Sequence, residues 1–528
     1  MQAKELILSP EEAFRPELFN QVFYQRLGLQ PDQGYHVRLL KRSIDARGKR
    51  VIVRVLCEIV PGVESKNLHN LAYPDVTLSR QVIIVGSGPA GLFAALRLIE
   101  LGVKPVIIER GSDVRKRRRD LAAINKHHIV NPESNYCFGE GGAGTYSDGK
   151  LYTRSKKRGD VQRILNILVA HGAHDDILYD AHPHIGTNKL PVLVEAIRNT
   201  IRQAGGEIHF DTKVVDLIIK GNTISGVRLA SGDTLHGEAV ILATGHSARD
   251  IYETLHRNEI AIEVKPFALG VRIEHPQELI DRIQYHCKIV RDPYLPASSY
   301  ALVHQAFGNG GQRGVFSFCM CPGGFIVPAA TAPGEVVVNG MSPSRRDSKF
   351  ANSGIVVAVE SSDFQQYGAG PLSGMYFQAA IERQACLTAG GNQTAPAQRL
   401  VDFLNGKVSD RLNESSYQPG LSSIDLHAVL PPFISNALKQ GFKNFGRRMK
   451  GYVTNEAQVV GVESRTSSPV RIPRTITLEH PQIHGLYPCG EGAGYAGGIV
   501  SAAIDGERCA EAIRDALNIT PKTIVAFG

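Results

Sequence analysis

Three glycines and one acid have the residue types and spacing that bind a dinucleotide. The glycines form the pattern Gly86-x-Gly88-x-x-Gly91, and Glu109 follows after about 20 residues. In this pattern the first glycine permits a tight turn, the second lets the backbone approach a pyrophosphate, and the third lets a helix pack closely on a sheet. The acid accepts hydrogen bonds from an adenosine ribose and would repel a 2′-phosphate. The pattern therefore predicts bound FAD or NAD in preference to NADP.

The residues around this pattern predict the elements that would position it. Residues 82–85 are an apolar run typical of a buried parallel strand. A helix is expected over residues 89–101, because a proline opens it and a glycine follows its end. A second apolar run at 106–108 then carries the acid. We expect the nucleotide to contact this unit at Gly86, Gly88, Pro89, Ala90, Gly91, Glu109 and Arg110.

Composition indicates a globular protein of several domains. The chain has 528 residues, of which 43% are hydrophobic and 21% charged. Acids occupy the N-terminal residues, where a signal peptide needs an apolar core, and no run of about 18 apolar residues occurs. We therefore expect a cytoplasmic protein without membrane contact. The eight cysteines form neither a disulfide framework nor a zinc motif, and the pair His182-x-His184 lacks a third ligand, so no metal site is predicted.

The net charge of +8 is modest for this length. Two basic runs, at residues 115–119 and 154–158, could attract an anionic substrate or a nucleic acid. A solvated charged face is the alternative interpretation of both runs.

The segment at residues 135–152 is unusually rich in glycine. Such a composition lets backbone approach a flat ligand, and we expect Gly144, Thr145, Ser147 and Asp148 to contact it. A surface loop is the alternative. Only one cysteine, Cys137, is present here, so a mechanism that relays electrons through a cysteine pair lacks its second sulfur.

Strand signals follow at residues 207–210, 214–219, 223–229 and 234–236, and we expect them to form a meander. A buried strand then ends in Ala243-Thr244-Gly245. This order resembles the glutathione-reductase-type FAD superfamily, in which Thr244 and Gly245 would mark the return of the chain to the nucleotide sheet. Val214, Thr244 and Gly245 are accordingly predicted at the cofactor.

A second glycine-rich signal occupies residues 486–499. Gly492-x-Gly494-x-x-Gly497 matches the dinucleotide pattern, but only about thirty residues follow, too few to complete a second nucleotide unit. The resemblance implies instead the distal flavin motif, in which Glu491 would hold a ribityl hydroxyl. A helix opening at Gly498 and Ile499 would direct its positive end at the flavin N1–O2 edge. Many superfamily members have aspartate at the position of Glu491. The predicted contacts are Gly490, Glu491, Gly498 and Ile499.

Nearly the whole chain resembles a largely uncharacterised family of FAD-dependent dehydrogenases from bacteria and plastids. The resemblance is carried by residues 41–47, 139–151, 316–324, 339–342, 461–472 and 487–499. It implies non-covalent FAD and oxidoreduction, and it supplies no substrate.

These observations predict an α/β fold of the FAD-binding, Rossmann-like type with two additions. Residues 1–75 would form a small N-terminal βαββ domain. Residues 76–259 and 476–528 would form the FAD-binding domain, with an α+β substrate domain inserted at 260–475. Basic residues of the N-terminal domain suit a docking or nucleic-acid surface, and a small sheet with exposed charges is the alternative.

Three residues outside the flavin motifs are candidates for catalysis. Arg465 could hold a substrate anion or polarise a carbonyl, because guanidinium binds either in a fixed fork. A salt-bridged turn would explain it equally well. Cys319-x-Cys321 is too close for an unstrained disulfide, and a buried structural pair is favoured over a redox pair beside flavin.

Two function classes remain open. The first is an oxidoreductase that transfers a hydride between a small-molecule substrate and FAD and exchanges electrons with transient NADH or NADPH, a carrier protein or oxygen. The second is a flavin-binding protein that acts on RNA or another macromolecule, similar to flavin-dependent tRNA-modifying proteins. Dispersed positive charge without an aromatic and basic platform favours the first and argues against a nucleic-acid partner.

Overall fold

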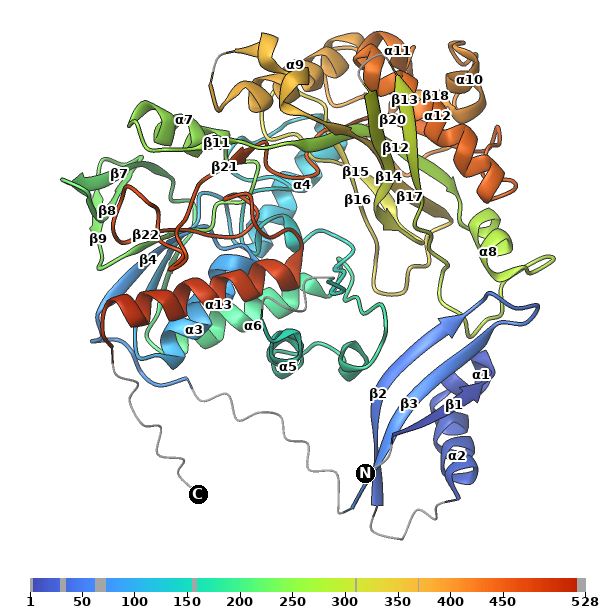
Figure 1. Cartoon of the computed structure of the whole chain (residues 1–528), viewed down its shortest axis with the longest axis horizontal. Coiled ribbons are helices and arrows are strands. Elements are labelled where there is room, and N and C mark those ends of the chain that lie inside the picture. The colour runs from blue at the N-terminus through green and yellow to red at the C-terminus, as the bar shows by residue number, and fades with distance from the viewer. Residues whose placement is uncertain are drawn as a thin grey trace.

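This computed structural model describes residues 3–28, 35–61, 73–153, 159–308, 311–368 and 370–519. The basic run at 154–158 lies outside these ranges. Figure 1 shows an α/β layer, a large sheet with helices above it, and a small N-terminal unit set to one side. No helix among the described residues is both long and apolar enough to cross a membrane.

The α/β layer is built on a five-stranded parallel sheet in the order β22-β10-β4-β5-β6. This sheet confirms the predicted Rossmann-like fold class. Its strands are nearly continuous apolar runs, as expected when both faces are covered. The strands are β4 (Gln81–Val85), β5 (Lys104–Ile108), β6 (Glu207–His209), β10 (Val240–Leu242) and β22 (Leu486–Pro488).

Helices cover one face of this sheet and a small antiparallel sheet lies on the other. The helices are α3 (Pro89–Glu100), α5 (Val161–Ala170), α6 (Leu190–Gln203) and α13 (Ile499–Ala516). The small sheet contains β7 (Val214–Lys220), β8 (Thr223–Leu229) and β9 (Thr234–His236). The prediction that residues 207–210 belong to this meander is wrong, because β6 pairs in parallel with β5 and completes the main sheet.

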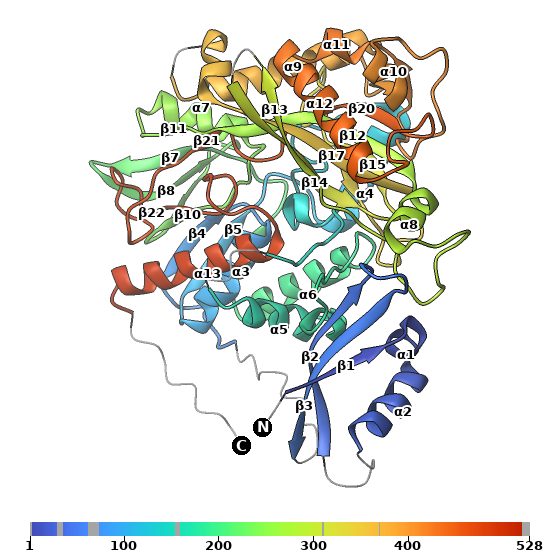
Figure 2. The same ribbon diagram turned by 45° about the vertical axis from the view of Figure 1, so that its right-hand side comes forward.

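The inserted part is built on a seven-stranded sheet in the order β13-β14-β17-β12-β20-β18-β19. One face is covered by α9 and α12, whose apolar side chains share a core with it (Figure 2). The strands are β12 (Phe267–Pro276), β13 (Val303–Gly308), β14 (Gly311–Cys321), β17 (Phe350–Val359), β18 (Ala395–Arg399), β19 (Leu421–Ser423) and β20 (Gln458–Glu463). The helices are α8 (Gln277–Tyr285), α9 (Ser373–Thr388), α10 (Leu400–Asn405), α11 (Leu426–Val429) and α12 (Pro432–Arg448).

Shorter elements join the two layers. They are α4 (Val114–His127), α7 (Arg249–Arg257), and the two-stranded pairs of β11 (Glu263–Val264) with β21 (Val470–Arg471) and β15 (Phe325–Pro328) with β16 (Val338–Met341).

The N-terminal unit is a three-stranded sheet in the order β1-β3-β2 with two helices packed on it. Its elements are β1 (Lys4–Leu8), α1 (Pro10–Phe14), α2 (Pro16–Leu27), β2 (Tyr35–Asp45) and β3 (Ile52–Pro61). The two helices are separated at Arg15, because Pro16 begins the second helix and disfavours helical geometry in the residue before it. Arg42 holds the unit to the α/β layer through two hydrogen bonds to Asp180, of 2.7 and 3.0 Å.

A buried ion-pair network clamps the two layers together. Arg249 on α7 bonds Glu335 at 3.0 Å and Glu382 on α9 at 2.9 Å. Arg465 follows β20 and bonds the same two acids at 2.8 and 2.9 Å. Burial alone would raise the pKa of Glu382, but the two guanidinium groups hold it below its usual value. The carboxylate therefore stays charged, and the network balances two cations with two acids.

Replacing Arg465 with methionine should destabilise the protein, because it leaves two buried acids with one cation. We expect a loss of about 3–5 kcal/mol in the free energy of unfolding, measured by denaturant titration. The control is Arg471→Met, whose guanidinium is half-exposed and 3.9 Å from Glu263, and which should change stability by about 0.5 kcal/mol or less. Equal stability of the two variants would show that the network contributes nothing.

The lowered pKa of the buried His275 side chain predicts how the free energy of unfolding depends on pH. Its Nε2 donates to Tyr452 O at 2.9 Å, and burial lowers its pKa to about 4. Since the unfolded pKa is near 6.5, unfolded chains bind more protons between these values, and stability should fall as pH drops through that window. Between pH 7 and 5 the loss should be about 2 kcal/mol. His275→Gln keeps a donor without titrating, so its unfolding free energy should vary less over this range; parallel pH profiles would contradict the assignment.

Candidate functional site

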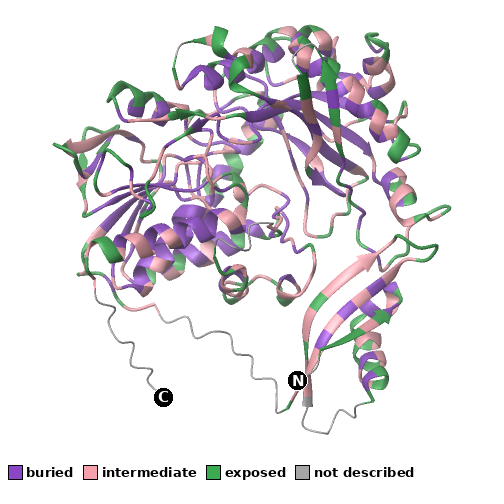
Figure 3. Cartoon of the chain, viewed as in Figure 1, coloured by how far each residue is buried: buried purple, intermediate pink, exposed green. Residues whose placement is uncertain are grey.

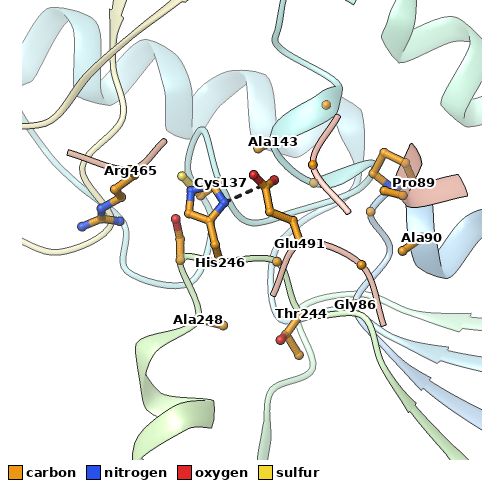
Figure 4. A pocket seen from close by; sticks show the side chains of 18 of the residues that line it. Gly86, Pro89, Ala90, Cys137, Ala143, Thr244, His246, Ala248, Arg465 and Glu491 are labelled. Carbon is orange, nitrogen blue, oxygen red and sulfur yellow. Dashed lines mark ion pairs between the residues drawn. The ribbon is translucent and has the colours of Figure 1, made fainter. Parts of the chain in front are cut away.

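One cavity of about 660 Å³ lies where the carboxyl ends of the parallel strands meet the large sheet (Figure 4). Its walls include the ends of β4, β5 and β10, the N-termini of α3 and α13, and residues of β14. This volume falls within the range of about 300–1,000 Å³ common for small-molecule and cofactor sites. The crevice outside the carboxyl ends of the strands is also where open α/β sheets bind their ligands.

The three glycines of the first motif have different structural roles. A side chain at Gly86, where φ is +106°, would lie 2.4 Å from Ala243 O, and one at Gly91 would lie 2.0 Å from Gly86 O. Both glycines are therefore required by close packing of the protein itself. A side chain at Gly88 would meet no atom within 4 Å, and Gly88 lines the cavity. The open space beside Gly88 fits a pyrophosphate that approaches the backbone.

Two helix N-termini face the cavity without a side-chain cap. Gly88 precedes α3 and Gly498 precedes α13, and neither helix start receives a side-chain hydrogen bond. The first N–H groups of a helix are free donors at its positive end. The start of α3 therefore suits a phosphate, and the start of α13 suits the electron-rich edge of a ring.

Two buried hydroxyl groups in the same wall have no hydrogen-bond partner. They are Thr244 Oγ1 and Ser247 Oγ, which both belong to cavity-lining residues. Buried polar groups are nearly always satisfied, so these two atoms indicate a missing ligand group. Together with Gly88 and the two helix starts, they show that the residues present fit FAD.

Glu109 already accepts four hydrogen bonds. The donors are Ser87 N at 2.9 Å, Ser87 Oγ at 2.8 Å, Gly111 N at 2.9 Å and Gly139 N at 3.0 Å. A carboxylate has about four acceptor positions, so a ribose hydroxyl would have to replace the Ser87 hydroxyl. Ribose binding by Glu109 stays a prediction. The neighbouring Arg110 is committed to Glu133 and Asp250.

The cavity brings together most of the predicted cofactor residues. Those that line it are Gly86, Gly88, Pro89, Ala90, Glu109, Arg110, Gly144, Ser147, Asp148, Val214, Thr244, Gly245, Gly490, Glu491, Gly498 and Ile499. Gly91 lies in the first turn of α3, outside the cavity lining, and acts through packing against Gly86. The prediction for Thr145 is corrected, because its hydroxyl is buried and donates to Glu140 O at 2.8 Å.

Asp148 is held by the inserted part of the molecule. Its carboxylate accepts two hydrogen bonds from Arg346, of 3.2 and 2.5 Å. Burial alone would raise the pKa of Asp148, but Arg346 and Lys150 lower it below its usual value. Asp148 is therefore a charged, already paired group, and its main contact joins the two layers.

His246 is a site residue that the sequence motifs did not indicate. Its Nδ1 lies 3.3 Å from Glu491 Oε2, and both side chains line the cavity (Figure 4). The loops that carry them are tightly packed, since a side chain at Gly492 would lie 2.6 Å from Gly245 O. The available signal was its position directly after Thr244 and Gly245. The contact leaves acceptor positions on Glu491 for a ligand hydroxyl.

Three lysines also line the cavity and were not predicted, and one of them, Lys213, is paired with Glu133 at 2.9 Å and Asp250 at 3.2 Å. Lys265 Nζ lies 3.4 Å from Ser468 O and 3.5 Å from Ser467 Oγ, and burial lowers its pKa. Lys150 donates to Met320 O and lies 4.0 Å from Asp148 Oδ2. Lys150 belongs to the glycine-rich segment, whereas no motif pointed to Lys265.

Cys319 and Cys321 line the cavity as free thiols. They lie at an irregularity in the pairing of β14 with β17, and Cys319 has a φ of +42°. Desolvation raises the pKa of the Cys319 thiol to about 12 and also raises that of Cys321. Both are therefore protonated and weakly nucleophilic at neutral pH. A redox role for them stays a prediction.

Arg465 reaches the cavity wall, but four of its five N–H donors are already in use. Its Nε and Nη2 bond Glu382 at 3.0 and 2.9 Å, Nη2 also bonds Glu335 at 2.8 Å, and Nη1 bonds Thr331 Oγ1 at 2.6 Å. The prediction that its fork holds a substrate anion is therefore corrected. Arg465 positions the large sheet, and any effect on a ligand passes through that sheet.

The basic run at residues 115–119 lies on α4, where one of its residues is buried and four are exposed. Arg115 pairs with Glu195 at 3.1 Å and Lys116 with Asp211 at 3.2 Å. Arg117 is fully buried and donates to three backbone carbonyls, those of Asn135, Tyr136 and Glu140. The other four residues of the run are exposed, so the run still presents positive charge on the surface of α4.

Comparison with protein families matches four stretches of the chain. Residues 266–466 match the family described as FAD-dependent protein, C-terminal domain-like. Residues 184–297 match the FAD dependent oxidoreductase family, and residues 79–130 match a FAD binding domain. Residues 1–60 match a domain of unknown function.

Among solved structures, glycine oxidase from Bacillus cereus is 14% identical, with 85% of this chain and 99% of that chain covered and a TM-score of 0.32. A similarity with so low a TM-score carries no inference about the function of this chain. Thiamine thiazole synthase from Aeropyrum pernix is 28% identical over 186 residues, which are 32% of this chain and 56% of that protein.

An uncharacterised protein from Clostridium beijerinckii is 41% identical over 508 residues, which are 93% of this chain and 94% of that protein. Because this identity extends over nearly all of both chains, the protein belongs to the same family as the clostridial protein, a family that carries the domains of FAD-dependent oxidoreductases.

Proposed function

We propose that the protein is an oxidoreductase that transfers a hydride between a small anionic metabolite and non-covalent FAD. The observation that carries this proposal is the meeting of two uncapped helix starts in one cavity, beside an open Gly88 and unpartnered hydroxyls. Those groups suit a ligand that has both a pyrophosphate and a polar ring.

Different residues of the cleft would bind different parts of the cofactor. Gly88 and the start of α3 would hold the pyrophosphate, and Glu109 the adenosine ribose. Glu491 would accept a ribityl hydroxyl, and the start of α13 would stabilise negative charge at the pyrimidine edge. FAD bound there supplies the hydride acceptor or donor.

The substrate would lie between this cofactor site and the large sheet. Lys150 and Lys265 supply positive charge to that space, which supports an anionic substrate. Lys265 contacts carbonyl and hydroxyl oxygens, so its charge is available to a ligand carboxylate or phosphate. His246 Nδ1 lies 3.3 Å from the Glu491 carboxylate, so this imidazole also lies beside the space proposed for the substrate.

Electrons would be exchanged with a partner that binds only transiently. The part of the chain that the structure describes contains one parallel sheet of the nucleotide-binding kind, so NADH or NADPH would bind over the flavin without a domain of its own. A carrier protein is the other partner we propose. The eight free cysteines support a reducing compartment such as the cytoplasm.

The test is anaerobic reduction of the purified holoprotein. NADH, NADPH and a panel of carboxylate and phosphate metabolites are scanned for loss of the flavin absorbance, and the same preparation is assayed for co-purified nucleic acid. Reduction by an anionic metabolite is the expected result. Stoichiometric RNA together with an inert flavin would favour the macromolecular alternative.

Gly88→Val should produce a folded protein without flavin. The backbone at Gly88 has φ −70°, which valine adopts, and no protein atom obstructs the new side chain, so only the pyrophosphate is blocked. We expect less than about one tenth of the wild-type FAD content at equal circular dichroism. Gly48→Val, in an open turn far from the cavity, is the control and should purify yellow. A fully flavinated Gly88→Val would remove the basis of the cofactor assignment.

Lys265→Met should weaken substrate binding without releasing the cofactor. Loss of a charge-assisted hydrogen bond should raise the half-saturating concentration of the best anionic reductant by about tenfold to a hundredfold. The measurement is the rate of flavin reduction against reductant concentration, with FAD content determined in parallel. Lys443→Met, on the exposed side of α12, is the control. A Lys265→Met enzyme with unchanged half-saturation would place the anion elsewhere.

A further inference from the structure

The large sheet carries an exposed apolar stripe that continues from the cavity. The stripe consists of Phe318 and Phe316 on β14 and of Val303 and Phe307 on β13. Phe318 lines the cavity, whereas Val303 and Phe307 are 55% and 68% exposed. Figure 3 shows β13 mainly in the colour of exposed residues. Apolar side chains grouped in this way on a surface commonly mark a binding site.

Alternation along β14 places the stripe on the face of the sheet that looks into the cleft. Side chains on a strand point alternately to its two faces. Val315 is fully buried in the core beneath α12, and the guanidinium of Arg313 lies 4.6 Å from the ring centre of Phe433 on α12. Phe316 and Phe318 therefore point to the opposite face, which is the face that forms the cavity wall.

The register of β13 extends this face outward. Val303 lies opposite Phe316, and Phe307 lies opposite Gln312. Directly opposed residues of antiparallel strands share a face, and Ala306 is buried on the other one. Gln305 lies opposite Gly314 on this face and is exposed, so one glutamine separates Val303 from Phe307 along β13. From Phe318 to the level of Phe307 the stripe is about 20 Å long, at about 3.4 Å per residue.

The free edge of β13 is blocked, so the stripe is not the start of a continuous sheet with another chain. Gln440 on α12 accepts from Phe307 N at 3.0 Å and donates to Phe307 O at 2.8 Å. Arg448 donates to Val303 O at 2.8 Å. These contacts occupy backbone groups that would otherwise pair with an added strand. A ligand can reach the side-chain face but not the edge.

We propose that the substrate is an amphiphile whose anionic end lies in the cleft and whose apolar chain lies along the stripe. This inference rests on the proposed function, since Lys150 and Lys265 provide the charge at the inner end. Continuity with the cavity through Phe318 identifies the occupant as the part of the substrate that projects from the cleft. A compact polar metabolite would leave Val303 and Phe307 without a role.

The test uses linear carboxylates from butanoate to dodecanoate as probes, below their micelle concentrations. Binding to the FAD holoprotein is measured by titration calorimetry and by the change in flavin absorbance. Each added methylene buried on the stripe should tighten binding by about threefold to fourfold. Affinity that does not depend on chain length would overturn the inference.

Variants at the exposed end of the stripe test whether the chain-length dependence of binding arises there. Phe307→Glu and Val303→Glu should each lower the ratio of dodecanoate to butanoate affinity by tenfold or more, and both positions are exposed enough to tolerate the change. Leu387→Glu, at a residue that is 72% exposed on α9, is the matched control and should keep the wild-type ratio. Wild-type ratios in both stripe variants would overturn the inference.

Two further readouts test whether a second copy of the chain covers the stripe and whether the stripe acts without FAD. Sedimentation velocity of wild type and Phe307→Glu tests the second copy, and a wild-type dimer that the variant converts to monomer would overturn the proposal. FAD content is determined first. A protein that purifies without FAD but keeps the chain-length dependence in calorimetry would refute the proposed function and leave the stripe standing. A protein that binds FAD but shows no chain-length dependence would overturn the inference about the stripe and leave the proposed function standing.

Discussion

The cleft depends on how closely α3 and α13 approach each other. A side chain at Gly506 on α13 would lie 2.1 Å from Ala90 O on α3, and one at Gly91 would lie 2.0 Å from Gly86 O. Neither contact can relax, because the atom approached is backbone. Gly506 therefore sets the distance between the two helices, and Gly91 packs the first turn of α3 on the turn that follows β4. A side chain at either position would move one helix start, and the free N–H groups of the two starts would no longer face the same ligand. The position of the cofactor site thus follows from missing side chains as much as from present ones.

The second constraint is the buried network of Arg249, Arg465, Glu335 and Glu382. It fixes the large sheet over the cleft, because its members come from α7 and from three separate parts of the sheet layer. Such a network is costly to break but contributes less to net stability than apolar packing of the same volume would. The network is important for geometry, since the distance between the large sheet and the cavity beside the parallel strands depends on this contact.

Much of the fold could be predicted from the sequence, because the decisive signals are local. The glycine pattern, the apolar strands and the Ala-Thr-Gly strand end each occupy a few consecutive residues, and most of the expected cofactor contacts do line one cavity. Partners distant in sequence could not be predicted. The acids that engage Arg465 lie 83 and 130 residues away, and the orientation of Thr145 depends on backbone at Glu140. His246 and Lys265 belong to no pattern of spacing, and only the fold brings them to the cleft.

The pairing of β10 has a consequence for how the protein is made. Val240 on β10 pairs with Ile83 on one side and with Leu486 on the other, and the entire large-sheet layer is synthesised between β10 and β22. During translation the outer edge of β10 stays open while the ribosome produces that layer, and an open edge favours misassociation. α13 also follows β22, so the second helix start reaches the cleft only after the sheet is complete. The cavity is therefore complete only once β22 and α13 have been synthesised, and a ligand that contacts both helix starts can bind only to the finished chain.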